Sequence, residues 1–384
     1  MEINSKLPTV GINIFSIMSA MANQYGAINL SQGFPDFDCP KDLQNRVNFH
    51  LKNGKNQYVP MAGVPLLRER LAKKMENSYG QRIDSDTEIT ITAGATQALF
   101  TAITAFVRNG EEVILIEPAY DSYRPAVELA GGIPIIYELE GPDYQIDWKS
   151  FGKLISPNTK MIIINTPHNP IGKIRSEEDM RALEELTKET DILVLSDEVY
   201  EHLIYDGKKH QSVLRFPDLF KRSLLVYSFG KTFHSTGWKM GYCVGPELLM
   251  REFRKVHQFN VFSCNSFVQY GIADFLEDPA TYQQLPEFYQ QKRDYFQNQL
   301  FGSALNPLSS EGSYFQLYDY SAVSDLPDTE FAKHLTKEIG VAAIPVSVFY
   351  SSGRDEKVVR FCFAKKEETL AAAGKLLKEI SPKS

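Results

Sequence analysis

The chain has 384 residues, 43% hydrophobic and 23% charged, which is long enough for two or three compact units with their own cores. Its 41 Lys and Arg residues stand against 48 Asp and Glu residues, and the net charge of −7 argues against nucleic acid or an anionic membrane as a partner. The four cysteines form no CxxC pair, and the seven histidines show no metal-ligand spacing. We therefore expect a folded cytoplasmic protein without a disulfide framework, a metal or a membrane span.

The first forty residues show no strand pattern and become rich in turn formers at Leu30–Pro40. We expect this segment to be an arm that packs beside a second, smaller domain.

Short apolar and β-branched runs follow through the middle of the chain. They predict seven strands, at Glu88–Thr92, Glu112–Ile116, Ile133–Leu139, Lys160–Asn165, Ile192–Ser196, Ser223–Ser228 and Gly241–Gly245. Helical patterns lie between most of them, as at Ala95–Val107 and at Ser176–Thr190, where Ser176 with Asp179 predicts an N-terminal cap. This alternation indicates an α/β fold with a mostly parallel sheet covered on both faces.

The pattern changes near residue 280. Pro279–Leu300 and Glu367–Ile380 have helical patterns, and Gly312–Asp319 and Val358–Phe363 are typical of strands. We therefore expect a smaller α+β domain. The predicted parts are 1–41, an arm with part of the small domain; 42–280, the large domain; and 281–384, the small domain.

Polar clusters stand where four of the predicted strands end. They are Thr92–Thr96, Asn165–Pro170, Ser196–Tyr200 and Ser228–Thr232. Ligands of open α/β sheets bind at the carboxyl ends of the strands, so these clusters predict one site.

Three of these clusters contain residues with clear chemical uses. Ala95 and Thr96 open a helix after small residues, and their free N–H groups suit a phosphate. Asp197 ends an apolar strand, where a carboxylate needs a cationic or hydrogen-bonding partner. Lys231, 34 residues later, is a candidate nucleophilic amine. Plainer interpretations are a tight turn at Gly94, a cap formed by Asp197 and a salt bridge formed by Lys231.

Two other motifs match this region only in part. Gly230-Lys231-Thr232 is similar to the end of a nucleotide-binding P-loop, but Leu225 stands where that motif has glycine. Ser228 and Lys231 have the SxxK spacing of penicillin-recognising hydrolases, but no Ser-Asp-Asn or Lys-Thr-Gly follows.

Taken together, several features resemble one enzyme family. These are the strand-end Asp197 and Lys231, the loop from Asn165 to Pro170, and the Gly-Trp-Lys-x-Gly segment at Gly237–Gly241. The whole chain is similar to the class I, fold type I, pyridoxal phosphate-dependent aminotransferases, with an aspartate aminotransferase-like fold. Within that family it most resembles bacterial methionine aminotransferases and the kynurenine aminotransferase/glutamine transaminase K group.

The resemblance implies pyridoxal 5′-phosphate as the cofactor. Lys231 would bind it covalently through its amine and then act as the acid and base, and Asp197 would pair with the protonated ring nitrogen. Asn169 and Tyr200 would bind the phenolic oxygen, and Tyr120 would stack on the ring. The phosphate ligands would be Ala95, Thr96, Ser228 and Lys239.

The resemblance also implies substrate contacts and a partner subunit. Arg360 would bind the substrate α-carboxylate beside Gly33 and Asn169, since a guanidinium offers two parallel hydrogen bonds. Tyr58 would reach the cofactor phosphate of a neighbouring subunit, and Phe262 would line that neighbour's pocket. We therefore expect a homodimer with shared active sites.

The expected reaction moves an amino group from an amino acid to a 2-oxo acid in ping-pong order. Phe15, Phe34, Tyr120 and Phe262 suggest a roomy apolar pocket, which suits methionine, aromatic amino acids or glutamine. Alternatives on the same residues are a cysteine-S-conjugate β-lyase and a kynurenine aminotransferase. The effector domain of a transcription factor is a third, but the chain lacks the length and positive charge for an added DNA-binding domain.

Overall fold

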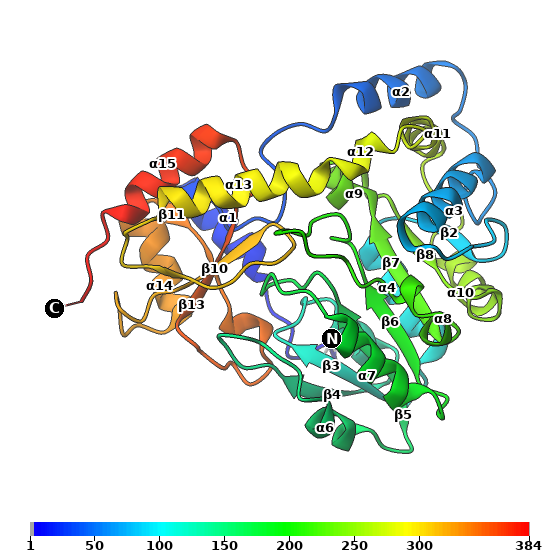
Figure 1. The fold of residues 1–384 in the computed structure, drawn as a ribbon, viewed down its shortest axis with the longest axis horizontal. Coiled ribbons are helices and arrows are strands. Elements are labelled where there is room, and N and C mark those ends of the chain that lie inside the picture. The colour runs from blue at the N-terminus through cyan, green and yellow to red at the C-terminus, as the bar shows by residue number, and fades with distance from the viewer. Residues whose placement is uncertain (1–3, 384) are drawn as a thin grey trace.

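The computed structural model describes residues 4–383 and contains a large body and a smaller one (Figure 1). The large body is built on a seven-stranded sheet with the order β2-β8-β7-β6-β5-β3-β4, in which only β8 runs antiparallel to its neighbours. Its strands are β2 (Ile89–Thr92), β3 (Glu112–Glu117), β4 (Ile133–Glu138), β5 (Thr159–Asn165), β6 (Leu193–Asp197), β7 (Ser223–Ser228) and β8 (Gly241–Val244). The predicted, mostly parallel seven-stranded sheet is confirmed.

Helices cover both faces of this sheet, as alternate side chains of each strand require. In β5, Met161 and Ile163 belong to one apolar cluster, and Ile162 and Ile164 belong to another. The first cluster includes side chains of α4 (Ala95–Phe106), α5 (Tyr123–Leu129) and α10 (Glu247–Asn260); the second includes those of α3 (Pro65–Tyr79) and α7 (Glu177–Thr187). Beyond the sheet, α2 (Lys41–Lys52) packs along α11 (Ser266–Phe275). The large body also contains three short helices, α6 (Trp148–Phe151), α8 (Pro217–Phe220) and α9 (Phe229–Thr232).

The predicted cap of α7 is confirmed. The Ser176 hydroxyl accepts a hydrogen bond from the Asp179 N–H at 3.1 Å, and the Asp179 carboxylate accepts one from the Ser176 N–H at 2.9 Å. This reciprocal pair satisfies N–H groups that have no partner inside the helix, so α7 begins where the sequence predicts.

The smaller body combines an antiparallel sheet with helices. Its strands, in sheet order, are β12 (Ile344–Pro345), β13 (Val358–Cys362), β10 (Phe315–Asp319) and β9 (Asn306–Pro307). The helices are α12 (Ala280–Gln283), α13 (Leu285–Gln299), α14 (Asp328–His334) and α15 (Glu367–Lys378). One helix was predicted over residues 279–300, but the structure has two, and Pro286 lies in the first turn of the second, where its missing N–H costs no hydrogen bond.

The N-terminal segment contains α1 (Ile14–Tyr25) and β1 (Ile28–Asn29). β1 pairs in parallel with β11 (Val341–Ala342), and α1 packs on the turn of π-helix η4 (Leu335–Ile339), so the arm lies beside the small body as expected. The sequence did not predict β1, because two residues are too few to form a periodic pattern.

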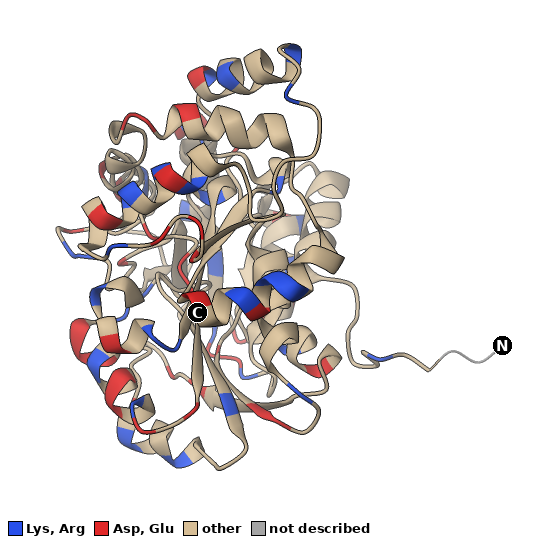
Figure 2. Cartoon of the chain, turned by 90° about the vertical axis from the view of Figure 1, so that its right-hand side faces the viewer, with Lys and Arg blue, Asp and Glu red and all other residues tan. Residues whose placement is uncertain are grey.

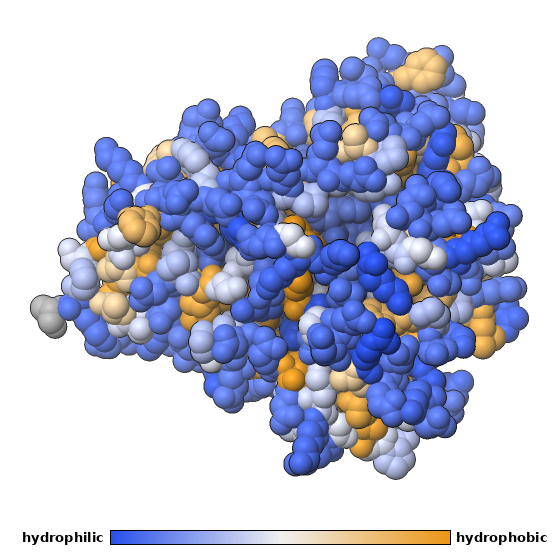
Figure 3. Space-filling model, viewed as in Figure 1, coloured by the Kyte–Doolittle hydropathy of each residue, from blue (hydrophilic) through white to orange (hydrophobic). Residues whose placement is uncertain are grey.

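Charged residues of both signs are interspersed over the face drawn in Figure 2, and the face in Figure 3 is mostly hydrophilic with scattered apolar side chains. Among residues 4–383, no helix has the length and hydropathy needed to cross a membrane. The proposed division at residues 41/42 and 280/281 stays a prediction.

Candidate active site

A cavity of about 390 Å³ opens where β5, β6 and β7 end. The arm and the small body also contribute to its walls, through Gly33 and Arg360. Of the residues predicted for one site, those that line this cavity are Phe15, Gly33, Phe34, Ala95, Thr96, Tyr120, Asn169, Asp197, Tyr200, Ser228, Lys231, Lys239 and Arg360.

Two predicted residues lie elsewhere in this chain. Tyr58 is 84% exposed and Phe262 is 44% exposed, and their rings meet edge to face with centroids 5.4 Å apart. Neither residue lines the cavity of its own chain. Their predicted contribution to a neighbouring subunit therefore stays a proposal.

Lys231 is held at the mouth of β7 by a short helix. The Ser228 hydroxyl caps α9 by accepting a hydrogen bond from the Lys231 N–H at 3.3 Å. The side-chain Nζ donates to the Gly33 carbonyl and to the Tyr314 hydroxyl, at 2.9 Å each. Burial, with a smaller contribution from the positive charge of Arg360, lowers the pKa of this amine to about 8 against the opposing effect of Asp197. About a tenth of the Lys231 amine is thus a neutral nucleophile at pH 7.

Asp197 ends β6 and is buried. Its Oδ2 accepts a hydrogen bond from the Tyr123 hydroxyl at 2.6 Å, and its Oδ1 accepts one from the Val199 N–H at 3.3 Å. Burial raises the pKa of this carboxyl to about 6, although both hydrogen bonds act in the opposite direction. A cation in the cavity would relieve this desolvation and keep Asp197 ionised.

Tyr123 was not identified as a site residue from the sequence. It lies three residues after Tyr120 at the start of α5, and the two rings meet edge to face with centroids 5.8 Å apart. The turn between them, closed by the Tyr123 N–H donating to the Tyr120 carbonyl at 3.2 Å, places Tyr120 against the cavity and Tyr123 on Asp197. The three-residue spacing of Tyr120 and Tyr123 was the sequence feature from which Tyr123 could have been identified as a site residue.

Asn165 and Asn169 connect β5 to the substrate side of the cavity. Asn165 donates to the Asp197 carbonyl at 2.9 Å and accepts from the Asn169 N–H at 2.7 Å. Arg360 Nη1 then donates to the Asn169 side-chain oxygen at 2.6 Å, and Nη2 donates to the Ser31 carbonyl at 3.1 Å. The four-residue spacing of the two asparagines thus orients the guanidinium.

Arg360 has capacity for a further acceptor. It is fully buried, its guanidinium lies 3.9 Å from the centroid of the Phe315 ring, and its Nε has no partner among the described residues. Burial lowers its pKa to about 10, so the group stays charged at neutral pH. A carboxylate entering the cavity would pair with a positioned and desolvated cation.

An anion can bind at the N-terminus of α4. Gly94 has φ 82°, which turns the chain into the helix and leaves the Ala95 and Thr96 N–H groups without acceptors inside the helix. The Lys239 amine lies 3.5 Å from the position that a Cβ on Gly94 would take. At Gly241 a Cβ would lie 2.9 Å from the Ala95 nitrogen, so only glycine lets β8 approach this closely.

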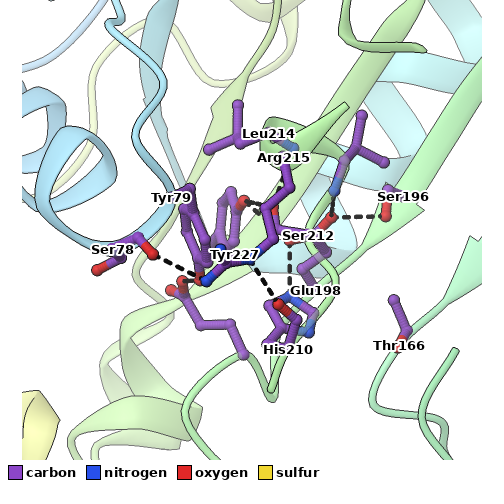
Figure 4. Close-up of polar contacts among 12 residues, drawn as sticks. Ser78, Tyr79, Thr166, Ser196, Glu198, His210, Ser212, Leu214, Arg215 and Tyr227 are labelled. Carbon is purple, nitrogen blue, oxygen red and sulfur yellow. Dashed lines mark hydrogen bonds and ion pairs between the residues drawn. The ribbon is translucent and has the colours of Figure 1, made fainter. Parts of the chain in front are cut away.

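Tyr200 reaches the cavity because hydrogen bonds on the interior side hold the turn after β6 in place. Glu198, fully buried, accepts hydrogen bonds from Ser196, Val213, His210 and Tyr227 at 2.9–3.0 Å (Figure 4). Three residues later, Glu201 accepts from Lys74 at 2.5 Å, from Tyr242 at 3.1 Å and from Tyr79. Asp197 and Tyr200 therefore face the cavity while the two glutamates face the interior. The sequence analysis did not identify this network.

Comparison with known proteins gives a consistent result over nearly the whole chain. The family model for aminotransferase class I and II matches residues 25–376. Methionine aminotransferase of Escherichia coli is 52% identical over 377 residues, and the match covers 98% of both chains. Kynurenine–oxoglutarate transaminase 1 of Mus musculus is 36% identical over 408 residues, and the match covers 97% of this chain and 96% of that protein. A solved Escherichia coli structure, described as having a methionine aminotransferase function, superposes with a TM-score of 0.97 at 52% identity, covering 99% of this chain and all of that one.

The predicted fold class and family are thereby confirmed, together with the action on an amino acid and a 2-oxo acid. With its strand-end lysine, aspartate and arginine around one cavity, this chain belongs to the class I and II aminotransferases.

Proposed function

We propose that this chain is a pyridoxal phosphate-dependent aminotransferase that moves the amino group of methionine, and also of aromatic amino acids or glutamine, to a 2-oxo acid. The observation that carries the proposal is the meeting of the side chains of Lys231, Asp197 and Arg360 around one cavity. The 52% identity to a methionine aminotransferase supports the choice of donor.

The side chains of the cavity fit the cofactor. The N-terminus of α4, Lys239 and Ser228 offer N–H, ammonium and hydroxyl donors to a phosphate. Asp197 has a desolvated carboxylate that lacks a cationic hydrogen-bond partner among the described residues, as a protonated ring nitrogen would require. Tyr120, at the start of the segment leading into α5, offers a ring face for stacking.

When bound, pyridoxal phosphate supplies an electron-withdrawing ring that stabilises negative charge at the substrate α-carbon. Asp197 would keep a proton on the ring nitrogen, since two unit charges about 4 Å apart attract by about 4 kcal/mol at an effective dielectric of 20. Asn169 and Tyr200 would hydrogen-bond the phenolic oxygen of the ring. The Lys231 amine would take the proton from the substrate α-carbon and pass it on to the cofactor carbon that carries the amino group.

Arg360 and the N-terminal arm orient the substrate. The guanidinium holds the α-carboxylate, and Gly33 leaves room beside it, because a Cβ there would lie 3.0 Å from the Phe315 ring. The amino group would stay on the cofactor when the first 2-oxo acid leaves, and a second 2-oxo acid would take it up on the same contacts, which makes the order ping-pong.

A neutral substrate side chain fits the rest of the cavity. Its cationic lining residues are Lys231, Lys239 and Arg360, all assigned above, and the remaining lining includes Phe15 and Phe34. A second carboxylate would therefore be buried without a cation, which is costly. Methionine avoids this cost.

We also propose that the enzyme is a cytoplasmic homodimer. The strong exposure of Tyr58 beside Phe262 supports this proposal, because two neighbouring exposed aromatics would be covered by a second subunit. In the dimer Tyr58 reaches the partner's phosphate, and Phe262 completes the partner's substrate pocket.

Kynurenine transamination is a second candidate, favoured by the 36% identity to kynurenine–oxoglutarate transaminase 1 over nearly the whole chain. A cysteine-S-conjugate β-lyase would use the same residues, but it would release ammonia and pyruvate instead of transferring the amino group.

The test is a panel of twenty amino acids against several 2-oxo acids, with ammonia and pyruvate measured in parallel. We expect methionine to give the highest kcat/KM and Lys231→Ala to lower kcat by at least about 10²-fold, because the acid and base is lost. Lys188→Ala, at an exposed lysine, is the control. Full turnover by Lys231→Ala would refute the proposal, and turnover confined to ammonia and pyruvate would favour the lyase.

A further inference from the structure

The Lys231 amine has two hydrogen-bond acceptors in the described structure, and one of them has no assigned role. Nζ donates to the Gly33 carbonyl and to the Tyr314 hydroxyl, at 2.9 Å each. Tyr314 lies just before β10 in the small body, 83 residues from Lys231 along the chain. The contact therefore joins the arm, the large body and the small body at one nitrogen atom.

These two acceptors match the donors of a neutral amine. A neutral lysine amine has two N–H donors and one lone pair, whereas the ammonium has three N–H donors. When Gly33 and Tyr314 accept both N–H bonds, the lone pair takes the remaining tetrahedral position. Because Lys231 lines the cavity, this position would be open to a substrate bound there.

The Tyr314 hydroxyl is itself fixed as an acceptor. Its own proton is donated to the Gly33 carbonyl, so the oxygen presents its lone pairs to Lys231. The ring is fully buried, with its centroid 5.1 Å from that of Tyr200 and 5.9 Å from that of Tyr289. Such packing leaves the hydroxyl little freedom to turn away.

We propose that Tyr314 is a positioning residue for the proton transfer, and that its hydroxyl, together with the Gly33 carbonyl, directs the lone pair of the free Lys231 amine toward the substrate α-carbon. This inference rests on the proposed function. The α-carbon proton moves to Nζ, the electron pair of the broken C–H bond stays with the substrate, and Lys231 becomes an ammonium. Tyr314 keeps its proton throughout, and Lys231 becomes neutral again when it passes the transferred proton on to the cofactor carbon that carries the amino group.

The sequence contains a matched control for this hydroxyl. Tyr318 lies four residues further on, in β10, is fully buried, and its hydroxyl has no hydrogen-bond partner in the described structure. Tyr314→Phe and Tyr318→Phe each delete one buried hydroxyl and keep the ring. Only Tyr314→Phe removes a contact to Lys231.

The first readout uses the loaded enzyme. With methionine deuterated at the α-carbon, we expect Tyr314→Phe to lower the single-turnover rate about 10-fold, because a hydrogen bond to a charged group is lost, and to raise the isotope effect. Tyr318→Phe should match the unsubstituted chain in both measurements. KM for methionine should change little, since Tyr314 does not bind the substrate.

The second readout needs no turnover. The covalent capture of pyridoxal phosphate by the apoenzyme requires a neutral Lys231, so its rate follows the protonation of this amine, whose pKa is about 8. Removing an acceptor of the ammonium makes the charged form less stable, so Tyr314→Phe should move the midpoint to lower pH. The groups that act on this titration are Asp197, Tyr200, Lys239, Arg360 and Cys362, and both variants keep all of them.

An unchanged midpoint and an unchanged single-turnover rate in Tyr314→Phe would overturn the inference. Thermal unfolding of both variants checks the fold, and if Tyr314→Phe does not fold, a crystal structure of the unsubstituted apoenzyme decides. There, Lys231 Nζ must lie within hydrogen-bonding distance of both acceptors, and any other partner overturns the inference. Failure of the unsubstituted chain to transaminate would instead reject the proposed function.

Discussion

At the scale of single residues, burial sets the chemistry of this site. Lys231 and Asp197 are both buried, and desolvation favours the neutral form of each, which lowers the lysine pKa to about 8 and raises the aspartate pKa to about 6. The lysine thereby becomes a nucleophile, and the aspartate becomes a carboxylate that gains from meeting a cation. These properties would suit the protonated ring and the aldehyde of the proposed cofactor.

Asp197→Asn tests this residue-scale argument. The amide has nearly the same shape but no charge, so an attraction of about 4 kcal/mol is lost, which corresponds to about 10³-fold in kcat. We expect the fold to survive and the absorbance spectrum of the bound cofactor to change. Asp143→Asn, at an exposed position, serves as the control. Near-normal turnover by Asp197→Asn would make this residue only a cap for the following turn.

At the scale of elements, the turn after β6 depends on helix α3. Lys74 of α3 is buried and bonds Glu201 at 2.5 Å, and its amine lies 5.6 Å from the centroid of the Tyr227 ring. Burial raises the pKa of Glu201, but the charge of Lys74 outweighs this effect and brings it to about 2. The helix on one face of the sheet thus helps to fix Asp197 and Tyr200 at its edge.

Lys74→Met should therefore destabilise the protein by about 3–5 kcal/mol, because the carboxylate of Glu201 stays buried without its cation. Urea unfolding measures the loss. The control is Lys73→Met, since Lys73 is exposed and pairs with Glu76 only at the surface. Adding Glu201→Gln to Lys74→Met should recover part of the stability, and equal midpoints for the two single variants would contradict the argument.

At the scale of the whole molecule, the cavity joins segments from all parts of the chain. Gly33 comes from the arm, Lys231 from the large sheet and Arg360 from β13 of the small body. In the proposed dimer, the exposed Tyr58 and Phe262 of a second subunit would complete the site. Cofactor binding should accordingly depend on assembly.

Tyr58→Phe tests the shared site. Loss of one hydroxyl bond to a phosphate should raise the dissociation constant of pyridoxal phosphate about 10-fold in the dimer. Equilibrium dialysis with light scattering at each concentration gives both the affinity and the mass, and Tyr25→Phe, at another exposed tyrosine, is the control. An unchanged affinity in a proven dimer would speak against the cross-subunit contact.

The strands and the polar residues at their ends could be predicted from the sequence alone. Each strand of the large sheet is a short apolar run, and the side chains at its carboxyl end meet those of its parallel neighbours. The placement of Lys231, Asp197 and Asn169 around one cavity follows from this local pattern. The start of α7 at Ser176 could also be predicted from the sequence, because a capping box involves residues only three positions apart.

Only the tertiary structure decided the contacts that orient these groups. Tyr314 reaches Lys231 across 83 residues, and Lys74 reaches Glu201 across 127. Periodicity and propensity describe neighbours along the chain, whereas these contacts depend on how one packed body meets another. The sequence therefore determined which polar groups meet at the cavity, and packing determined which hydrogen-bond partners orient them.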